Sequence, residues 1–275
     1  MVAQPEHADC AGHPVDPPVL FAATDLFAIW HYGIKALMPY NDLAMLPNAT
    51  LNLLPTPLER GDKPLQVIAV CSSKGGAGKT TLSQCLAVEA LRQGIAAAII
   101  DTDPQKSATD WGHQREQAGI GAPAVVPLGS RSLLIVVEEL AVRGAALVVI
   151  DTPPHSAPAI NAAMEVSTAA VMVTRPNPMD IRALEATWAI VDRMKKPATT
   201  IFTQTPPGSR ARALALALDR LAELGIPYCP TPLTYTLGFP YAQAEALTVQ
   251  EREPTGKARA EVAEVWGWLK RKAIF

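Results

Sequence analysis

Short apolar runs rich in β-branched residues alternate with longer amphipathic stretches from Pro64 onward. The runs predict buried strands of a mostly parallel sheet, and the stretches predict helices on both of its faces. The predicted strands are QVIAVC (66–71), IAAAIID (95–101), AVVPL (124–128), ALVVID (146–151), AAVMVT (169–174) and ATTIFTQ (198–204). The clearest helical stretches are TLSQCLAVEALRQG, SLLIVVEELAVRG, MDIRALEATWAIVDRM and ARALALALDRLAELG, with glycine stop signals at Gly94, Gly144 and Gly225. This pattern predicts a doubly wound α/β domain over residues 65–275.

Residues 1–64 do not follow this pattern. Prolines recur along them and interrupt any period, which is typical of an irregular extension. Their most apolar segment, LFAIWHYGIKALM, contains His31 and Lys35, so it predicts a short surface or docking helix rather than a membrane span. The N-terminal stretch MVAQPEHADCAGHPVDPPVL lacks the basic region followed by an apolar run that is typical of a secretory signal. We assign no chemistry to this extension.

The overall charge is nearly balanced, with 24 Lys and Arg against 26 Asp and Glu in 275 residues. Composition therefore gives no sign of a dedicated nucleic-acid-binding surface, and any DNA contact must be local. Four cysteines without a CxxC pair argue against a zinc site, a redox motif or a disulfide scaffold. We expect a protein of the reducing cytoplasm.

A glycine-rich loop, SKGGAGKTT (73–81), lies between the first predicted strand and the first predicted helix. Such a loop lets backbone N–H groups and a helix N-terminus surround phosphate oxygens. Lys79 would reach the β- and γ-phosphates, and the Thr80 hydroxyl would bind magnesium. The predicted nucleotide-binding residues of the loop are Lys74, Gly75, Gly76, Ala77, Gly78, Lys79, Thr80 and Thr81. One lysine suffices for this task, so Lys74 is either an exposed loop residue or has a second role.

Three aspartates stand at or just after the ends of two predicted strands. Asp101 and Asp103 stand in IIDTDPQKSAT (99–109), and residues two apart on an extended strand point the same way. Asp151 ends the strand ALVVID. Ligands of open α/β sheets bind at this edge, so the carboxylates predict a metal–phosphate centre. The alternative is structural: Asp103 caps the next helix, and Asp151 only terminates its strand.

These motifs resemble those of the ParA/MinD family of P-loop ATPases. KGGAGKTT resembles its deviant Walker A motif, although Ser73 stands where the standard motif has glycine, and DTDPQ and ALVVIDTPP resemble its Walker A′ and Walker B motifs. The resemblance implies a P-loop fold that binds ATP and Mg²⁺ as a homodimer with two nucleotides sandwiched between the subunits. It also implies that Lys74 crosses to the partner's phosphates as an arginine finger does.

The same resemblance assigns the remaining roles. Lys74, Lys79 and Asp103 are the implied catalytic residues, and Asp103 orients or deprotonates the attacking water. Asp151 binds magnesium with Thr80, and Asp101 supports the magnesium shell. Pro176, Asn177 and the loop 204–207 are placed near the base by position alone.

The C-terminal pattern is closest to partition proteins, which implies a nucleoid-associated ATPase that binds DNA nonspecifically and is stimulated by a ParB-like partner. Candidate DNA contacts are Arg210, Arg212, Lys257, Arg259, Lys270 and Arg271. Solvated helix faces are the alternative for each of them. Residues 232–243 contain no cation, although the family commonly has arginines there, which weakens the DNA assignment.

Two other functions within the family remain open. A VirC-like scaffold would use the same dimer to recruit a DNA-transfer or secretion complex. A MinD-like ATPase would cycle on a membrane through its last helix. The pattern of the last helix argues against a membrane role, because its apolar residues form the stripe of a helix packed on its own core: Val262, Val265, Trp266, Leu269 and Ala273.

Overall fold

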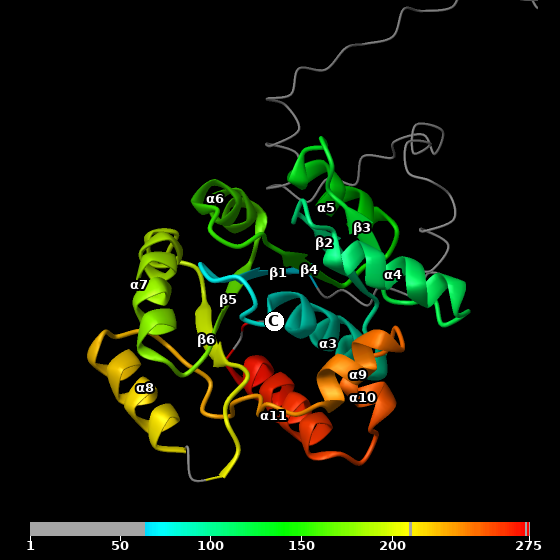
Figure 1. Ribbon diagram of the computed structural model, residues 1–275. Coiled ribbons are helices and arrows are strands. Elements are labelled where there is room, and N and C mark those ends of the chain that lie inside the picture. Colours follow the sequence, from blue (N-terminus) through cyan, green and yellow to red (C-terminus); the bar gives the residue numbers. More distant parts are fainter. Residues whose placement is uncertain (1–63, 209–210, 273, 275) are drawn as a thin grey trace, which may run out of the picture. The chain divides into compact units, whose positions relative to one another are not determined.

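A parallel sheet of six strands forms the centre of the fold. The structure is a computed structural model that describes residues 64–208, 211–272 and 274. The strands are β1 (Gln66–Cys71), β2 (Ala97–Asp101), β3 (Ala124–Pro127), β4 (Leu147–Asp151), β5 (Ala169–Thr174) and β6 (Ala198–Phe202). They pair in the order β3-β2-β4-β1-β5-β6, and every pair is parallel. The predicted doubly wound α/β fold is thereby confirmed (Figure 1).

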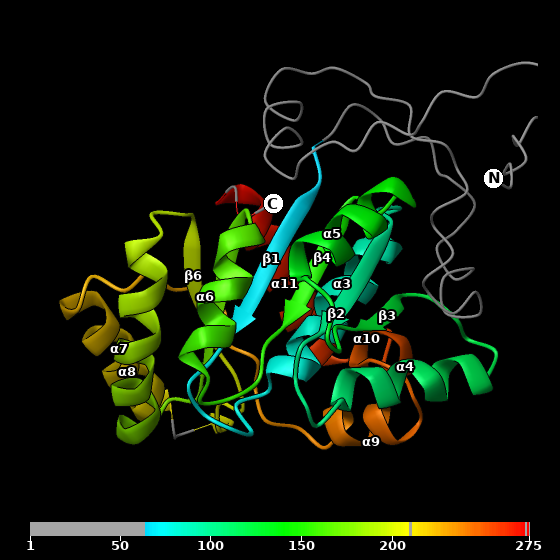
Figure 2. The same cartoon turned by 90° about the horizontal axis from the view of Figure 1, so that it is seen from above.

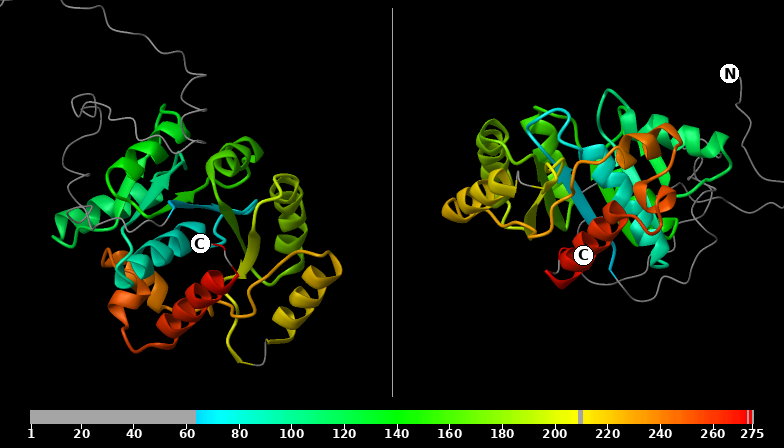
Figure 3. Two further views of the ribbon diagram at one scale, coloured as in Figure 1. Left: turned by 180° about the vertical axis from the view of Figure 1, so that it is seen from behind. Right: turned by 60° about the horizontal axis from the view of Figure 1, so that its bottom comes forward.

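Helices cover both faces of this sheet (Figures 1 and 2). Their bounds are α3 (Lys79–Arg92), α4 (Ser107–Gln117), α5 (Leu133–Val142), α6 (Ala157–Val166), α7 (Pro178–Arg193), α8 (Ala211–Glu223), α9 (Gly238–Ala244), α10 (Val249–Arg252) and α11 (Lys257–Arg271). Helices α3 and α11 pack on one face, side by side in both views of Figure 3. Helices α5, α6, α7 and α8 contribute to the core on the other face.

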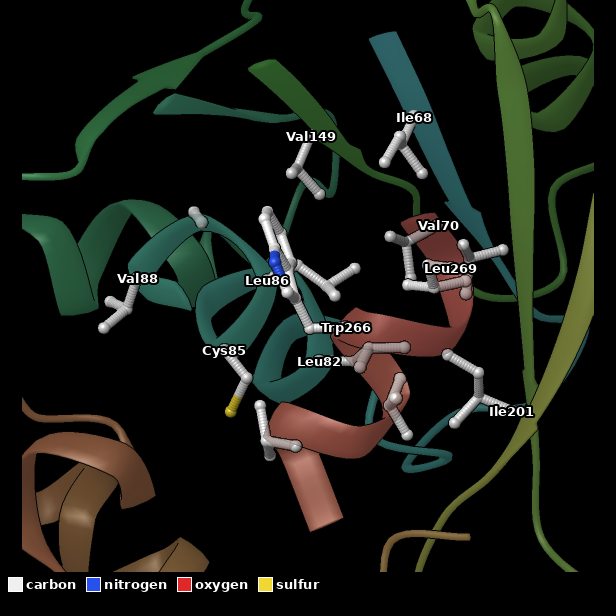
Figure 4. Packing of buried hydrophobic residues seen from close by; sticks show 14 of the residues in the cluster. Ile68, Val70, Leu82, Cys85, Leu86, Val88, Val149, Ile201, Trp266 and Leu269 are labelled. Atoms are coloured by element: carbon white, nitrogen blue, oxygen red, sulfur yellow. The ribbon is translucent and has the colours of Figure 1, made fainter. Parts of the chain in front are cut away.

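The two cores explain why the strands are apolar without interruption. Along β1, Ile68 and Val70 belong to the core under α3 and α11, whereas Val67 and Ala69 belong to the opposite core. Alternate side chains of a strand point to opposite faces, so a sheet covered on both sides buries all of them. Figure 4 shows residues of the first core, to which Ile68 and Val70 of β1 and Trp266 of α11 all belong.

The predicted helix ends and the predicted last helix are confirmed. Left-handed glycines follow α3, α5 and α8 at Gly94, Gly144 and Gly225. Four members of the apolar stripe of α11 are buried in the core: Val262, Val265, Trp266 and Leu269. Ala273 and the predicted extension up to residue 63 lie outside the described residues. Among the residues that the structure describes, no helix is long and apolar enough to cross a membrane.

Candidate nucleotide-binding site

The glycine-rich loop joins the centre of the sheet to the first covering helix. It begins after β1 and ends at Gly78, which holds the left-handed φ of 86° directly before α3. Gly76 is also left-handed, with a φ of 68°. No atom lies within 4 Å of the point where a Cβ of Gly75 or Gly76 would stand. The loop therefore leaves open space beside its backbone N–H groups, as a phosphate-binding loop requires.

Lys79 brings a buried positive charge to this loop. Its side chain is almost fully buried, and its Nζ donates to the Lys74 carbonyl at 3.4 Å. Burial lowers the pKa of Lys79, while the Asp151 and Asp103 carboxylates act in the opposite direction. No ion pair of Lys79 is found within the described part of the chain. An anion beside the open loop would restore favourable solvation to this ammonium group.

Asp151 and Thr80 form a pair of oxygen ligands at the end of β4. The Thr80 hydroxyl donates to Asp151 Oδ2 at 2.7 Å, and the Ser83 hydroxyl donates to Oδ1 at 3.2 Å. Burial raises the pKa of Asp151 to about 7, against the Thr80 hydrogen bond, and the Asp101 carboxylate raises it further. A carboxylate and a hydroxyl side by side are the hard oxygen ligands that magnesium prefers, so these residues fit the ion.

Ser83 was not among the predicted site residues. It lies three residues after Thr80 and therefore on the same side of α3, which is the signal that could have identified it.

Both carboxylate oxygens of Asp101 accept hydrogen bonds from neighbouring residues of the site. Its Oδ1 accepts the Asp103 N–H at 3.0 Å, and its Oδ2 accepts both the N–H and the hydroxyl of Thr109 at 2.8 Å. Asp101 thus holds the first turn of α4 and the loop that carries Asp103. It is also the register partner of Asp151 across β2 and β4. Thr109 is a contributor that the sequence did not single out.

Asp103 keeps one oxygen available. Its Oδ1 accepts the Gln105 N–H at 2.9 Å, and no hydrogen bond to Oδ2 is found among the described residues. It does not cap α4, because the carboxylate that receives Thr109 belongs to Asp101 and the residue before the helix is Lys106. The alternative role of Asp103 as the helix cap is therefore wrong.

The Lys74 backbone is hydrogen-bonded within the loop, whereas its side chain has no partner in the part of the chain that the structure describes. Its N–H donates to Ser72 Oγ at 3.2 Å, and its carbonyl accepts from Lys79. Nowhere in the described residues does the Lys74 ammonium group form a hydrogen bond or an ion pair, and the residue is half-buried. The side chain is free to contact a group outside its own subunit.

The residues that follow β6 also hold the loop. Thr203 Oγ1 donates to the Ala77 carbonyl and Gln204 Nε2 donates to the Gly76 carbonyl, both at 2.6 Å. Gln204 was expected near the base from its position. In the structure it supports the phosphate-binding loop.

The other predicted base contacts lie at the start of α7. Asn177 caps this helix, because its Oδ1 accepts the Asp180 N–H at 2.9 Å. Pro176 and Asn177 line a cavity of about 390 Å³ between α7 and α8, whose lining includes no residue of 72–81. The contact of Pro176 and Asn177 with the base stays a prediction.

The candidate DNA contacts lie on α8 and α11. Arg212 is exposed on α8, and Lys270 and Arg271 are exposed at the end of α11. Lys257 is exposed but forms an ion pair with Glu261 at 3.5 Å. Arg259 is half-buried, and its Nε has no hydrogen-bond partner in the described residues. Arg210 lies outside the described residues.

Comparisons with known proteins agree with this geometry. A family model described as "CobQ/CobB/MinD/ParA nucleotide binding domain" matches residues 68–249, more than half of the chain. The maintenance of carboxysome distribution protein A of Gloeobacter kilaueensis is 35% identical over 167 residues, which cover 59% of this chain and 73% of that protein. Protein ParA of Rhizobium radiobacter is 25% identical over 176 residues, which cover 62% of this chain and 78% of that protein.

Among solved structures, the septum site-determining protein MinD of Pyrococcus horikoshii, complexed with Mg-ADP, is similar in fold. Its TM-score is 0.57 at 15% sequence identity, over 76% of this chain and 98% of the other.

Proposed function

This chain belongs to the CobQ/CobB/MinD/ParA family of nucleotide-binding domains and is a ParA/MinD-type ATPase, and we propose that it is an ATP-dependent dimerising switch that positions a cargo. The cargo we propose is a plasmid or chromosome, moved by a dimer that binds DNA nonspecifically. A ParB-like partner would stimulate hydrolysis, and the protein would work in the cytoplasm on the nucleoid. Residues 65–275 would form the ATPase domain, preceded by the extension 1–64.

The observation that carries the proposal is the Thr80–Asp151 pair beside Lys79 and the open glycine loop. The amides of residues 75–80 and the Lys79 ammonium group would bind the phosphates of ATP. Thr80 and Asp151 would hold magnesium, which would supply positive charge to neutralise the phosphates. Asp101 would support this centre from behind, through the loop that it holds.

Asp103 and Lys74 would manage the hydrolysis step. The free Oδ2 of Asp103 would accept a hydrogen bond from the attacking water and orient it toward the γ-phosphate. The Lys74 ammonium group has no partner among the described residues and would reach the nucleotide of a second copy, where negative charge gathers during phosphoryl transfer. Hydrolysis would then depend on dimerisation, and its products would release the dimer.

A second candidate is a scaffold ATPase that recruits a protein complex. Three large apolar side chains are about half exposed where the family commonly has arginines: Tyr235, Leu237 and Tyr241, at 54%, 54% and 52%. An exposed aromatic surface suits a protein partner better than DNA phosphates. A membrane-cycling role is less favoured, since Trp266 is buried in the core.

ATP turnover with and without duplex DNA tests the proposal on the wild type, Lys74→Ala and Asp103→Ala. We expect Asp103→Ala to bind ATP and remain a dimer without turning it over, and Lys74→Ala to lose most of its dimer formation and to keep only a small residual turnover. Lys195→Ala is the matched control, because Lys195 is an exposed lysine at the opposite edge of the sheet, paired with Asp192. If Lys74→Ala dimerises and hydrolyses ATP as the wild type does, the proposed function is wrong.

A DNA-binding assay distinguishes the partition function from the scaffold function. Partition requires ATP-dependent DNA binding that weakens steeply with salt. If DNA binding is absent at low salt while the ATP dimer forms, the scaffold function is favoured instead.

A further inference from the structure

A hydrogen bond links the phosphate-binding loop to a helix more than one hundred residues away. The hydroxyls of Ser73 and Thr187 lie 2.5 Å apart. Thr187 is fully buried in α7, where a hydroxyl group without a partner would be costly. Ser73 supplies that partner from the position where the standard motif has glycine, and it directly precedes Lys74.

The loop is thus held by two different elements. Its later half is held by the end of β6, through Thr203 to Ala77 and Gln204 to Gly76. Its earlier half contains Lys74, whose backbone contacts within the loop are Ser72 and Lys79. The bond to Thr187 ties this half to a separate element of the fold.

We propose that Thr187 is a positioning residue that acts through Ser73 on Lys74. This inference rests on the proposed function, in which Lys74 reaches the nucleotide of a second copy. The Lys74 ammonium group sits at the end of a flexible four-carbon stem, so a small rotation of the loop backbone displaces it widely. A displacement of about 1 Å in a charged group of a reaction centre can reduce the rate on the order of 100-fold.

A purely structural role for Thr187 makes different predictions. Loss of a buried hydrogen bond alone would lower the stability of the protein and leave the chemistry of the folded molecules unchanged. A positioning role affects turnover and dimer formation in molecules that are fully folded and that bind ATP normally. The effect must also vanish when Lys74 is absent, because it is transmitted through that residue.

The experiment uses the full chain with Thr187→Val, Thr187→Ser and the control Thr199→Val. Thr199 is buried in β6, and its hydroxyl has no partner within the described residues, so its replacement removes no hydrogen bond. We measure thermal unfolding, ATP affinity, ATP-dependent dimerisation and turnover. We expect Thr187→Val to bind ATP within about twofold of the wild type and to lose roughly 10-fold or more in turnover. Thr187→Ser should restore turnover, and Thr199→Val should match the wild type.

Combination with Lys74→Ala gives the decisive comparison. In that background we expect Thr187→Val to change turnover by less than about twofold, since residues that act through one another are not additive. Ser73→Ala removes the same bond from the less buried side and should reproduce the loss even if Thr187→Val does not fold.

Wild-type turnover in both Ser73→Ala and Thr187→Val overturns the inference. An equal further loss from Thr187→Val in the Lys74→Ala background also overturns it. If Lys74→Ala alone has normal turnover, the proposed function fails first, and this inference fails with it.

Discussion

The contribution of one buried carboxyl group, Asp151, to the stability of the nucleotide-free protein should fall as the pH rises from 4 to 7. Asp151 is fully buried at the end of β4, and burial raises its pKa from an ordinary 3.8 to about 7. In the unfolded chain the same group loses its proton near pH 4. Between these values the folded state holds one proton more than the unfolded state, so each rise in pH favours unfolding.

The size of the effect follows from the difference between the two pKa values. One pH unit corresponds to about 1.4 kcal/mol, so a difference of about three units amounts to about 4 kcal/mol. This stabilisation is fully present below pH 4 and is lost once the pH exceeds about 7. Asparagine at position 151 carries no charge at any pH. At pH 8 we therefore expect Asp151→Asn to unfold with a free energy up to about 4 kcal/mol higher than the wild type.

Urea unfolding between pH 4 and pH 8 measures this difference. Only the difference between wild type and variant is compared, because other groups titrate in both proteins. Asp219→Asn is the control for the chemical change from aspartate to asparagine, since Asp219 is exposed on α8. If the difference for Asp151→Asn is constant from pH 4 to pH 8, Asp151 is not held in its protonated form and the argument is refuted.

Three further predictions concern stability and binding. Arg115→Ala should lower the free energy of unfolding by about 4 kcal/mol in urea titrations, because it removes the buried Arg115 side chain and leaves the partly buried Glu251 carboxylate without its ion-pair partner. A loss below about 1 kcal/mol would contradict this. Trp266→Ala should lower the free energy of unfolding by about 3–5 kcal/mol in the same assay, because Trp266 is buried in the core. If the variant instead keeps its stability and shows altered ATP-dependent liposome flotation, a membrane role is supported. If Lys270 and Arg271 contact DNA, their joint replacement by alanine should reduce the salt slope of binding by about 1.8, and an unchanged slope would exclude them.

The sequence alone determined those features that depend on neighbours along the chain. Each of the six strands was visible as a short apolar run, because a sheet covered on both faces buries every side chain of its strands. The glycine-rich loop was visible for a similar reason, since its spacing between a strand and a helix is itself the motif. Polar or short helices such as α4 and α9 carry no comparable periodic signal, and they were not among the clearest helical stretches.

Only the tertiary structure decided how the site residues are held. The aspartates 101 and 103 look alike in sequence, and their contacts show that the first holds α4 and the loop while the second keeps an oxygen free. The contacts of Ser73 with Thr187 and of Gly76 with Gln204 join residues 114 and 128 positions apart. The Gly76–Gln204 contact arises where the ends of parallel strands meet at one edge of the sheet, and the Ser73–Thr187 contact arises where α7 packs beside the loop. No local pattern in the sequence records which distant residues meet there.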